Sequence, residues 1–224
     1  MLKAQLNALK EARMTALIKI TTEQSVAILT MNTAENRHNP SFIAELNQHL
    51  DSIEANGDIN AVVLTSSSDK SWSLGIDLQW MASSDNTPTV IADFMNSIGQ
   101  LFKRIVTFPM PIIAALNGHT YGNGSVLACA CDFRFMKSDK GFFCFPEVDV
   151  LVPFVPSMFP IINKAINPQF FNRLAMTGER VDAQKLLQQN VVEAIFADEQ
   201  ALQTGVLEFA QSFNKNRWIY SQNK

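Results

Sequence analysis

Two segments of the chain share one pattern, in which a short apolar run is followed by a glycine-containing turn and the start of a helix. The first reads AVVLTSSSDKSWSLGIDL at residues 61–78, and the second reads PIIAALNGHTYGNGSVLACACD at residues 111–132. Short, uninterrupted apolar runs are typical of parallel strands that are buried on both faces. Because these strands alternate with helical patterns, the sequence predicts an α/β fold with a parallel sheet.

The rest of the hydrophobic pattern is consistent with this class. Residues 15–20 and 25–31 predict a pair of strands near the N-terminus. Asn39 is a favourable N-cap and Pro40 a favourable first-turn residue, so a helix is predicted from there to about residue 56. We further predict helices at 75–81, 88–108 and 122–130, and strands at 132–136, 141–145 and 191–196. Residues 66–73 are predicted to form a polar loop, and the chain from residue 156 on is mostly helical.

The charge balance and the cysteine content exclude several classes of protein. The 224 residues include 18 Lys and Arg and 21 Asp and Glu, a net charge of −3, which argues against a nucleic-acid partner. Three cysteines do not make a disulfide scaffold and fit a reducing cytosol, so we predict a cytoplasmic location. The most apolar stretches, 105–116 and 148–162, are interrupted by prolines and fall short of a membrane span. Residues 1–13 lack the apolar region of a signal peptide, and the sequence leaves Met1 and Met14 as alternative starts.

The two glycine turns have features of a ligand site. Glycine lets the backbone approach a ligand closely, and the first turn of a helix leaves main-chain N–H groups without partners. Two such turns that face each other place two N–H groups on one oxygen atom, an arrangement called an oxyanion hole. The alternative is that Gly75, Gly122 and Gly124 only form tight turns, and the spacing alone does not decide between the two.

A third segment, GFFCFPEVD at residues 141–149, places two carboxylates among apolar side chains. Burial in such surroundings raises the pKa of a carboxyl group, so Glu147 or Asp149 becomes usable as a general base near neutral pH. The alternative is a carboxylate held in place by an arginine or by backbone N–H groups. The cysteines and His119 lack the spacing of a metal site, so we predict no metal.

Five short motifs, taken together and in this order, resemble the crotonase (enoyl-CoA hydratase/isomerase) superfamily. They are KSWSLGIDL at 70–78, the run at 111–132, FPE at 145–147, TGERVDA at 177–183 and VVEAI at 191–195. The phrases GIDLQW at 75–80, NGH at 117–119 and DKGFF at 139–143 most resemble the short Δ3,Δ2-enoyl-CoA isomerases.

This resemblance implies a spiral of ββα units with a helical C-terminal part, usually assembled as a homotrimer or a dimer of trimers. It divides the chain into an N-terminal extension at 1–14, a crotonase core at 15–196 and a short C-terminal helical tail at 197–224. The implied substrate is an acyl-CoA thioester. Coenzyme A is then part of the substrate, and no separate cofactor, nucleic acid or membrane partner is expected.

Matching the motifs position by position also implies the site residues. The main-chain N–H groups of Ile76 and Asn123 correspond to the oxyanion donors, and Glu147 corresponds to the catalytic base. Asn123 stands where the family usually has glycine. The implied substrate-binding and CoA-binding residues are Arg37, His38, Lys70, Leu74, Gly75, Asp77 and Gly122.

Two departures from the family pattern narrow the expected chemistry. Hydratases carry a second glutamate where this chain has Val126, so simple hydration is disfavoured and isomerisation with one base is favoured. Many members carry a lysine where this chain has Gln79, which leaves the CoA phosphates to Lys70, Arg37 or a neighbouring subunit. The alternatives are another crotonase reaction (acyl-CoA hydrolysis, C–C cleavage or hydration by an unusual mechanism) and a catalytically inactive acyl-CoA-binding homologue.

Overall fold

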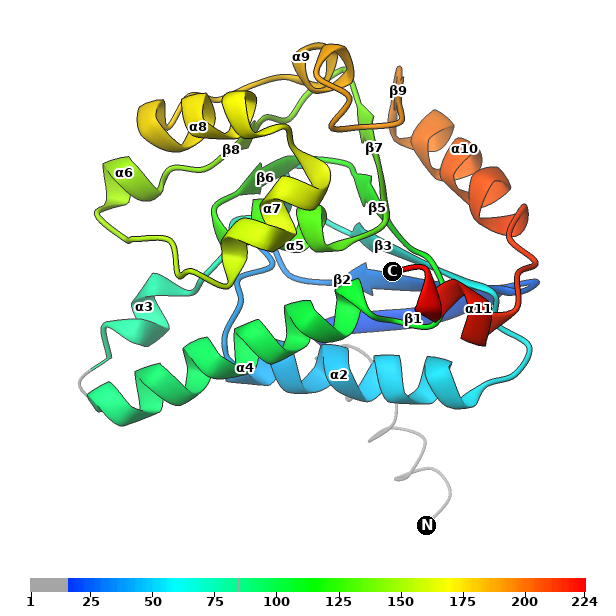
Figure 1. The fold of residues 1–224 in the computed structure, drawn as a ribbon, viewed down its shortest axis with the longest axis horizontal. Coiled ribbons are helices and arrows are strands. Elements are labelled where there is room, and N and C mark those ends of the chain that lie inside the picture. The colour runs from blue at the N-terminus through cyan, green and yellow to red at the C-terminus, as the bar shows by residue number, and fades with distance from the viewer. Residues whose placement is uncertain (1–15, 84) are drawn as a thin grey trace, which may run out of the picture.

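The computed structural model describes residues 16–83 and 85–224 and contains two sheets (Figure 1). The main sheet has six strands in the order β1-β2-β3-β5-β7-β9, of which β1 and β2 are antiparallel and all other neighbours are parallel. Its strands are β1 (Ile18–Glu23), β2 (Val26–Met31), β3 (Ala61–Ser66), β5 (Ile112–Leu116), β7 (Phe133–Lys137) and β9 (Ala194–Phe196). The predicted α/β class with a parallel sheet is therefore confirmed.

The central strands β3 and β5 are buried along their whole length because helices cover both faces of the main sheet. On β3, Val62 and Leu64 belong to the larger apolar core, whereas the intervening Val63 belongs to a smaller core on the opposite face. Successive side chains of a strand point to opposite faces, so an uninterrupted apolar run serves both cores. Helix α10 (Glu199–Gln211) covers the smaller core with Leu202, and Figure 1 shows it on the opposite side of the sheet from α5.

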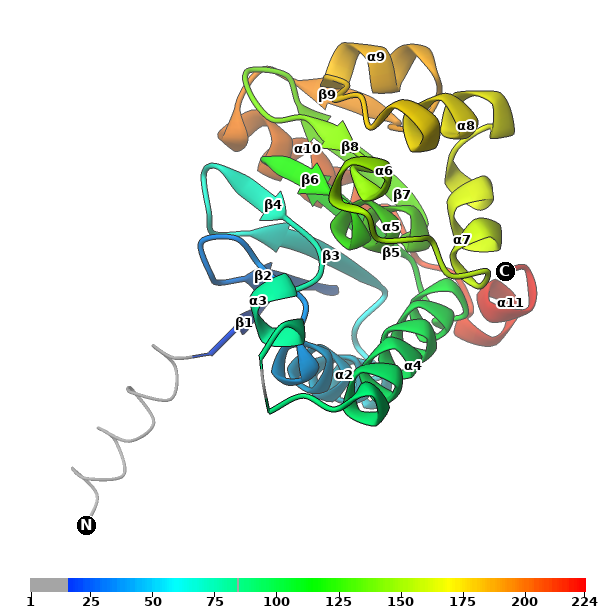
Figure 2. The ribbon, with the colours of Figure 1, turned by 90° about the vertical axis from the view of Figure 1, so that its left-hand side faces the viewer.

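Figure 2 shows the remaining helices from the side, and all of them except the two short helices that begin at Glu147 and Arg217 contribute residues to the larger core or pack against it. The remaining helices are α2 (Pro40–Ala55), α3 (Leu78–Met81), α4 (Pro88–Val106), α5 (Asn123–Ala130), α6 (Glu147–Val150), α7 (Met158–Ala165), α8 (Pro168–Thr177), α9 (Ala183–Gln188) and α11 (Arg217–Gln222). The expected cap at Asn39 is present, since its side chain accepts the Phe42 N–H at 3.1 Å. Asp182 caps α9 in the same way through the Lys185 N–H.

A second sheet, of three short strands, corrects the prediction of a polar loop at residues 66–73. Its strands are β4 (Ser71–Ser73), β6 (His119–Tyr121) and β8 (Phe143–Cys144), all parallel. Both serines of β4 are buried, and their hydroxyl-rich sequence gives no apolar signal. They are tolerated inside the protein because they form hydrogen bonds; Ser73 Oγ, for example, donates to the Asn36 carbonyl at 2.8 Å.

Several boundaries differ from the predicted ones. Helix α3 begins at Leu78 rather than at residue 75, and the strands expected at 141–145 and 191–196 shrink to β8 and β9. Glu147 begins a helical turn, α6, that the sequence pattern did not indicate. The N-terminal extension at 1–14 lies outside the described residues.

Among the described residues, none of the helices combines the length and the apolar character that crossing a membrane requires.

Candidate active site

Three loops follow the three strands of the second sheet and meet at one edge of it. The loops are 74–77 after β4, Gly122 after β6, and 145–146 after β8. Parallel strands bring their carboxyl ends to the same edge, which is where ligands of open α/β sheets bind. A cavity of about 90 Å³ lies there, and the residues lining it are Arg37, Leu74, Ile76, Leu78, Met95, Gly122, Asn123, Pro146, Glu147, Val150, Val152, Pro153 and Met158.

Gly75 brings the first loop against the second. Its φ of +77° lies in the left-handed region, and a Cβ atom there would come within 2.8 Å of the Asn123 nitrogen and of the Tyr121 carbonyl oxygen. Only a residue without a side chain fits this approach. The interpretation of Gly75 as more than a tight turn is therefore supported by its direct contact with the neighbouring loop.

The second loop leads into the N-terminus of α5. Gly122 has φ +55° and ψ −126°, and the helix begins immediately after it at Asn123 without a side-chain cap. Within the described residues, the N–H groups of Ile76 and Asn123 donate to no acceptor. The free Asn123 N–H at the start of α5 carries partial positive charge and favours an oxygen that gains negative charge, whereas the Ile76 N–H lies in the loop before α3.

Glu147 supplies the carboxylate of the cavity. Its Oε1 lies 3.5 Å from the position that a Cβ on Gly122 would occupy, which places the carboxyl group beside the start of α5. Its Oε2 is buried and has no hydrogen-bond partner among the described residues. Loss of solvation on burial raises the pKa of Glu147 from 4.5 to about 7, only partly opposed by its own backbone N–H. Of the cavity-lining residues, Glu147 alone is acidic.

This raised pKa has a consequence for stability. Between pH 4.5 and about 7 the folded protein retains the Glu147 proton while the unfolded chain has lost it, so stability falls as the pH rises. We expect Glu147→Gln to stabilise the fold by about 3 kcal/mol above pH 7, since the pKa is raised from 4.5 to about 7 and one pKa unit corresponds to about 1.4 kcal/mol. Urea denaturation at about pH 4 and about pH 8 measures this; an equal effect of the substitution at both pH values would contradict it.

Most of the residues predicted from the sequence come together here. Ile76, Asn123 and Glu147 line the cavity, and so do Arg37, Leu74 and Gly122. The Arg37 guanidinium donates from Nη1 to the carbonyl oxygens of Leu74 at 2.8 Å and Ile76 at 3.3 Å. Arg37 therefore supports the first loop from the side of the cavity.

Four predicted binding residues are not among the residues that line the cavity: Gly75, described above, and Lys70, Asp77 and His38. Lys70 precedes β4 and is at the opposite end of that strand from the cavity. Asp77 caps α3, since its Oδ1 accepts the Trp80 N–H at 2.9 Å. His38 is 1% exposed and is not among the residues that line the cavity. The second carboxylate of the acidic segment, Asp149, is exposed on α6 and also lies outside the cavity lining.

The structure adds apolar residues to the site that the motifs did not single out. Met95 comes from α4, Met158 from α7, and Val152 from the segment after α6. Their only sequence signal is an apolar position, which does not distinguish a cavity wall from the core. Val126 is fully buried within α5 and is not one of the cavity-lining residues.

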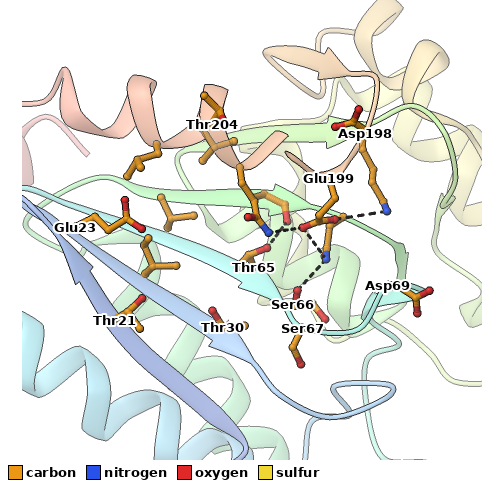
Figure 3. A pocket seen from close by; sticks show the side chains of 18 of the residues that line it. Thr21, Glu23, Thr30, Thr65, Ser66, Ser67, Asp69, Asp198, Glu199 and Thr204 are labelled. Atoms are coloured by element: carbon orange, nitrogen blue, oxygen red, sulfur yellow. Dashed lines mark hydrogen bonds and ion pairs between the residues drawn. The ribbon is translucent and has the colours of Figure 1, made fainter. Parts of the chain in front are cut away.

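A larger hollow of about 710 Å³ lies on the face of the main sheet near α10 (Figure 3). Thr21 and Thr30 come from β1 and β2, across from Thr204 on α10. Lys137 also lines this hollow, and its buried ammonium group, Nζ, is 3.5 Å from Glu199 Oε2 and 3.8 Å from the nearer carboxylate oxygen of Asp139. None of the residues predicted for the site lines this hollow.

Comparison with known proteins bears on the family and the fold of this chain. A family model for enoyl-CoA hydratase/isomerase matches residues 21–224. Enoyl-CoA delta isomerase 2, peroxisomal, of Arabidopsis thaliana is 25% identical over 190 residues, which cover 82% of this chain and 79% of that protein. The 2,3-dehydroadipyl-CoA hydratase of Escherichia coli is 27% identical over 187 residues, with 82% and 71% covered. The structure of Pseudomonas aeruginosa DspI has a TM-score of 0.83 at 23% identity, covers 92% of this chain and 79% of that chain, and shows the same fold.

Proposed function

The chain belongs to the enoyl-CoA hydratase/isomerase family, and we propose that it is a Δ3,Δ2-enoyl-CoA isomerase that uses one glutamate as a proton shuttle. The observation that carries this proposal is that Glu147 is the one carboxylate among the cavity-lining residues and lies beside a free main-chain donor. A hydratase of this family needs a second carboxylate to activate water, and Val126 stands in its place.

In the proposed reaction the thioester oxygen accepts hydrogen bonds from the N–H groups of Ile76 and Asn123. The Glu147 carboxylate removes a proton from C2 of a 3-enoyl-CoA, and the electron pair moves onto the thioester oxygen as a dienolate. The protonated Glu147 then returns the proton to C4, and the double bond ends between C2 and C3. The carboxylate is regenerated, so no other reactant is consumed. The two N–H donors lower the activation free energy because they bind the enolate oxygen more strongly than the carbonyl oxygen.

The test is turnover of a set of CoA thioesters that differ in the position of the double bond. We expect conversion of 3-enoyl-CoA into 2-enoyl-CoA, followed by the absorbance of the conjugated thioester. Release of free CoA would indicate hydrolysis, and a shortened acyl product would indicate C–C cleavage. Binding without turnover would indicate an inactive homologue, and each of these three outcomes would overturn the isomerase proposal. Assembly as a trimer and a cytoplasmic location stay predictions of the sequence.

The pH profile of the reaction follows from the pKa of Glu147. The base must be deprotonated to accept the C2 proton, and burial places its pKa at about 7. We expect kcat/KM for 3-enoyl-CoA to rise about ten-fold per pH unit below pH 7 and to level off above it. An inflection near the ordinary glutamate value of 4.5 would contradict the assignment of the base.

A further inference from the structure

His38 contacts the residue that provides the second proposed oxyanion donor. The Asn123 Nδ2 lies 2.8 Å from His38 Nδ1, although the two residues are 85 positions apart in the chain. Both side chains are buried, with 1% of His38 and 4% of Asn123 exposed. Helix α5 has no side-chain cap at Gly122. The contact with His38 is therefore what holds the side chain of Asn123, the first residue of the helix.

The hydrogen bonds around Ser73 determine which nitrogen of His38 carries the proton. Ser73 Oγ donates its single hydrogen to the Asn36 carbonyl at 2.8 Å and accepts the Gly75 N–H at 3.2 Å. The 3.0 Å contact with His38 Nε2 then requires that Nε2 carries the proton and donates. His38 Nδ1 is left as an acceptor for the Asn123 amide, and burial lowers the pKa of His38 to about 3, which keeps the ring neutral.

The main chain of His38 holds the first donor as well. Its N–H donates to the Gly75 carbonyl at 2.8 Å, and its own carbonyl accepts the Asp77 N–H at 2.9 Å. Ile76 lies between these two bonds, in a bridge with His38. His38 therefore forms hydrogen bonds with both loops that carry a proposed donor.

We infer that His38 is a positioning residue that holds the Ile76 and Asn123 donors at a fixed separation, and that Asn123 takes part through its side chain. This inference rests on the proposed function, because it concerns the same oxyanion hole. Donors must sit within a few tenths of an ångström of their productive place, and such precision requires support from neighbouring side chains. A glycine at position 123 would offer His38 no such contact, which gives a physical role to the departure from the family pattern at this position.

The test is a double-mutant cycle with His38→Leu, Asn123→Ala and the double variant. We expect each single variant to lower kcat for 3-enoyl-CoA about ten-fold with little change in KM, because the enolate depends on the donors more than the bound substrate does. The double variant should lose no more than the larger single loss. Additive losses, or a rise in KM at constant kcat, would overturn the inference.

Two conservative variants separate positioning from packing. Asparagine places its Oδ1 near the position of histidine Nδ1 and can accept the Asn123 amide, so His38→Asn should recover part of the kcat. Glutamine reaches instead toward the position of Nε2, so His38→Gln should not recover it. Equal activity of the two variants would overturn the inference. His49→Leu is the matched control, because this histidine contacts the Ile18 carbonyl at 3.0 Å, does not line the cavity and should leave kcat unchanged.

A readout without turnover distinguishes failure of this inference from failure of the proposed function. The infrared carbonyl stretch of hexanoyl-CoA labelled with ¹³C at the thioester should shift to lower frequency on binding to the wild-type protein. His38→Leu should reduce this shift, whatever reaction the site catalyses. A protein that isomerises no substrate but shows this pattern refutes only the proposed function. A full shift in His38→Leu refutes the positioning role, and no shift in the wild type refutes both.

Discussion

Glutamine in place of Glu147 is expected to lower kcat for isomerisation about 10³-fold or more, the largest effect of any single substitution in this protein. The amide keeps the shape of the side chain but cannot accept the C2 proton. Because Glu147 is the one acidic residue in the cavity lining, no neighbouring carboxylate there can take over its role. Single-turnover conversion of 3-enoyl-CoA measures the chemical step, and hexanoyl-CoA binding should be retained.

Asp149→Asn provides the matched control for this prediction. Asp149 lies two residues further along α6, is exposed and is not part of the cavity lining. The Asp149→Asn substitution removes one negative charge from the same helical turn, so a general electrostatic effect of that turn would appear in both variants. Near wild-type turnover is expected for Asp149→Asn. Turnover of Glu147→Gln comparable to that of the wild type would show that the base is another group.

Alanine in place of Gly75 is expected to have the second largest effect, acting through the backbone. The added Cβ would lie 2.8 Å from the Asn123 nitrogen and from the Tyr121 carbonyl oxygen, and φ at this position is +77°. Relief of this contact separates the two loops, so the donors no longer converge on one oxygen. We expect kcat/KM to fall about 10²–10³-fold, as on loss of one oxyanion donor. Thermal and urea denaturation should show a loss of stability of about 2 kcal/mol.

Gly99→Ala is the control for the same chemical change in another place. Gly99 lies within α4, and a Cβ there meets no other atom within 4 Å. Alanine in a helix is favoured over glycine, so a gain of about 0.5–1 kcal/mol is expected with unchanged kcat. If Gly75→Ala proved as stable and as active as Gly99→Ala, the close approach of the two loops would have no functional role.

The main sheet was largely predictable, whereas in the second sheet only β8 was expected, as part of the strand predicted at 141–145. The strands β3 and β5 appear in the sequence as short apolar runs, because their side chains are buried on both faces. The strand β4 consists of two serines around Trp72, and β8 has only two residues. Such short strands exist because neighbouring strands and hydroxyl hydrogen bonds satisfy their polar groups, and these contacts have no local sequence pattern.

The residues of the site were also predictable only in part. The glycine turns and the acidic segment left alternatives open, and the resemblance to the family implied Ile76, Asn123 and Glu147. The structure brings these three residues to the lining of one cavity. The resemblance also suggested ligand contacts for His38 and Lys70, which the structure does not bring to the cavity lining. The direction of a side chain depends on which elements pack around it, and neither residue carries a local signal of that packing.

The sequence by itself predicted the α/β class, because strand, turn and cap signals are local, and five motifs in order indicated the family. The roles of Ile76, Asn123 and Glu147 follow from that resemblance and stay proposals. The tertiary structure alone decided that one of two nearby carboxylates, Glu147, is desolvated while Asp149 is exposed. It also decided that His38 meets Asn123 across 85 residues. Solvation and long-range contacts arise only when distant segments pack together, so they cannot be derived from neighbours along the chain.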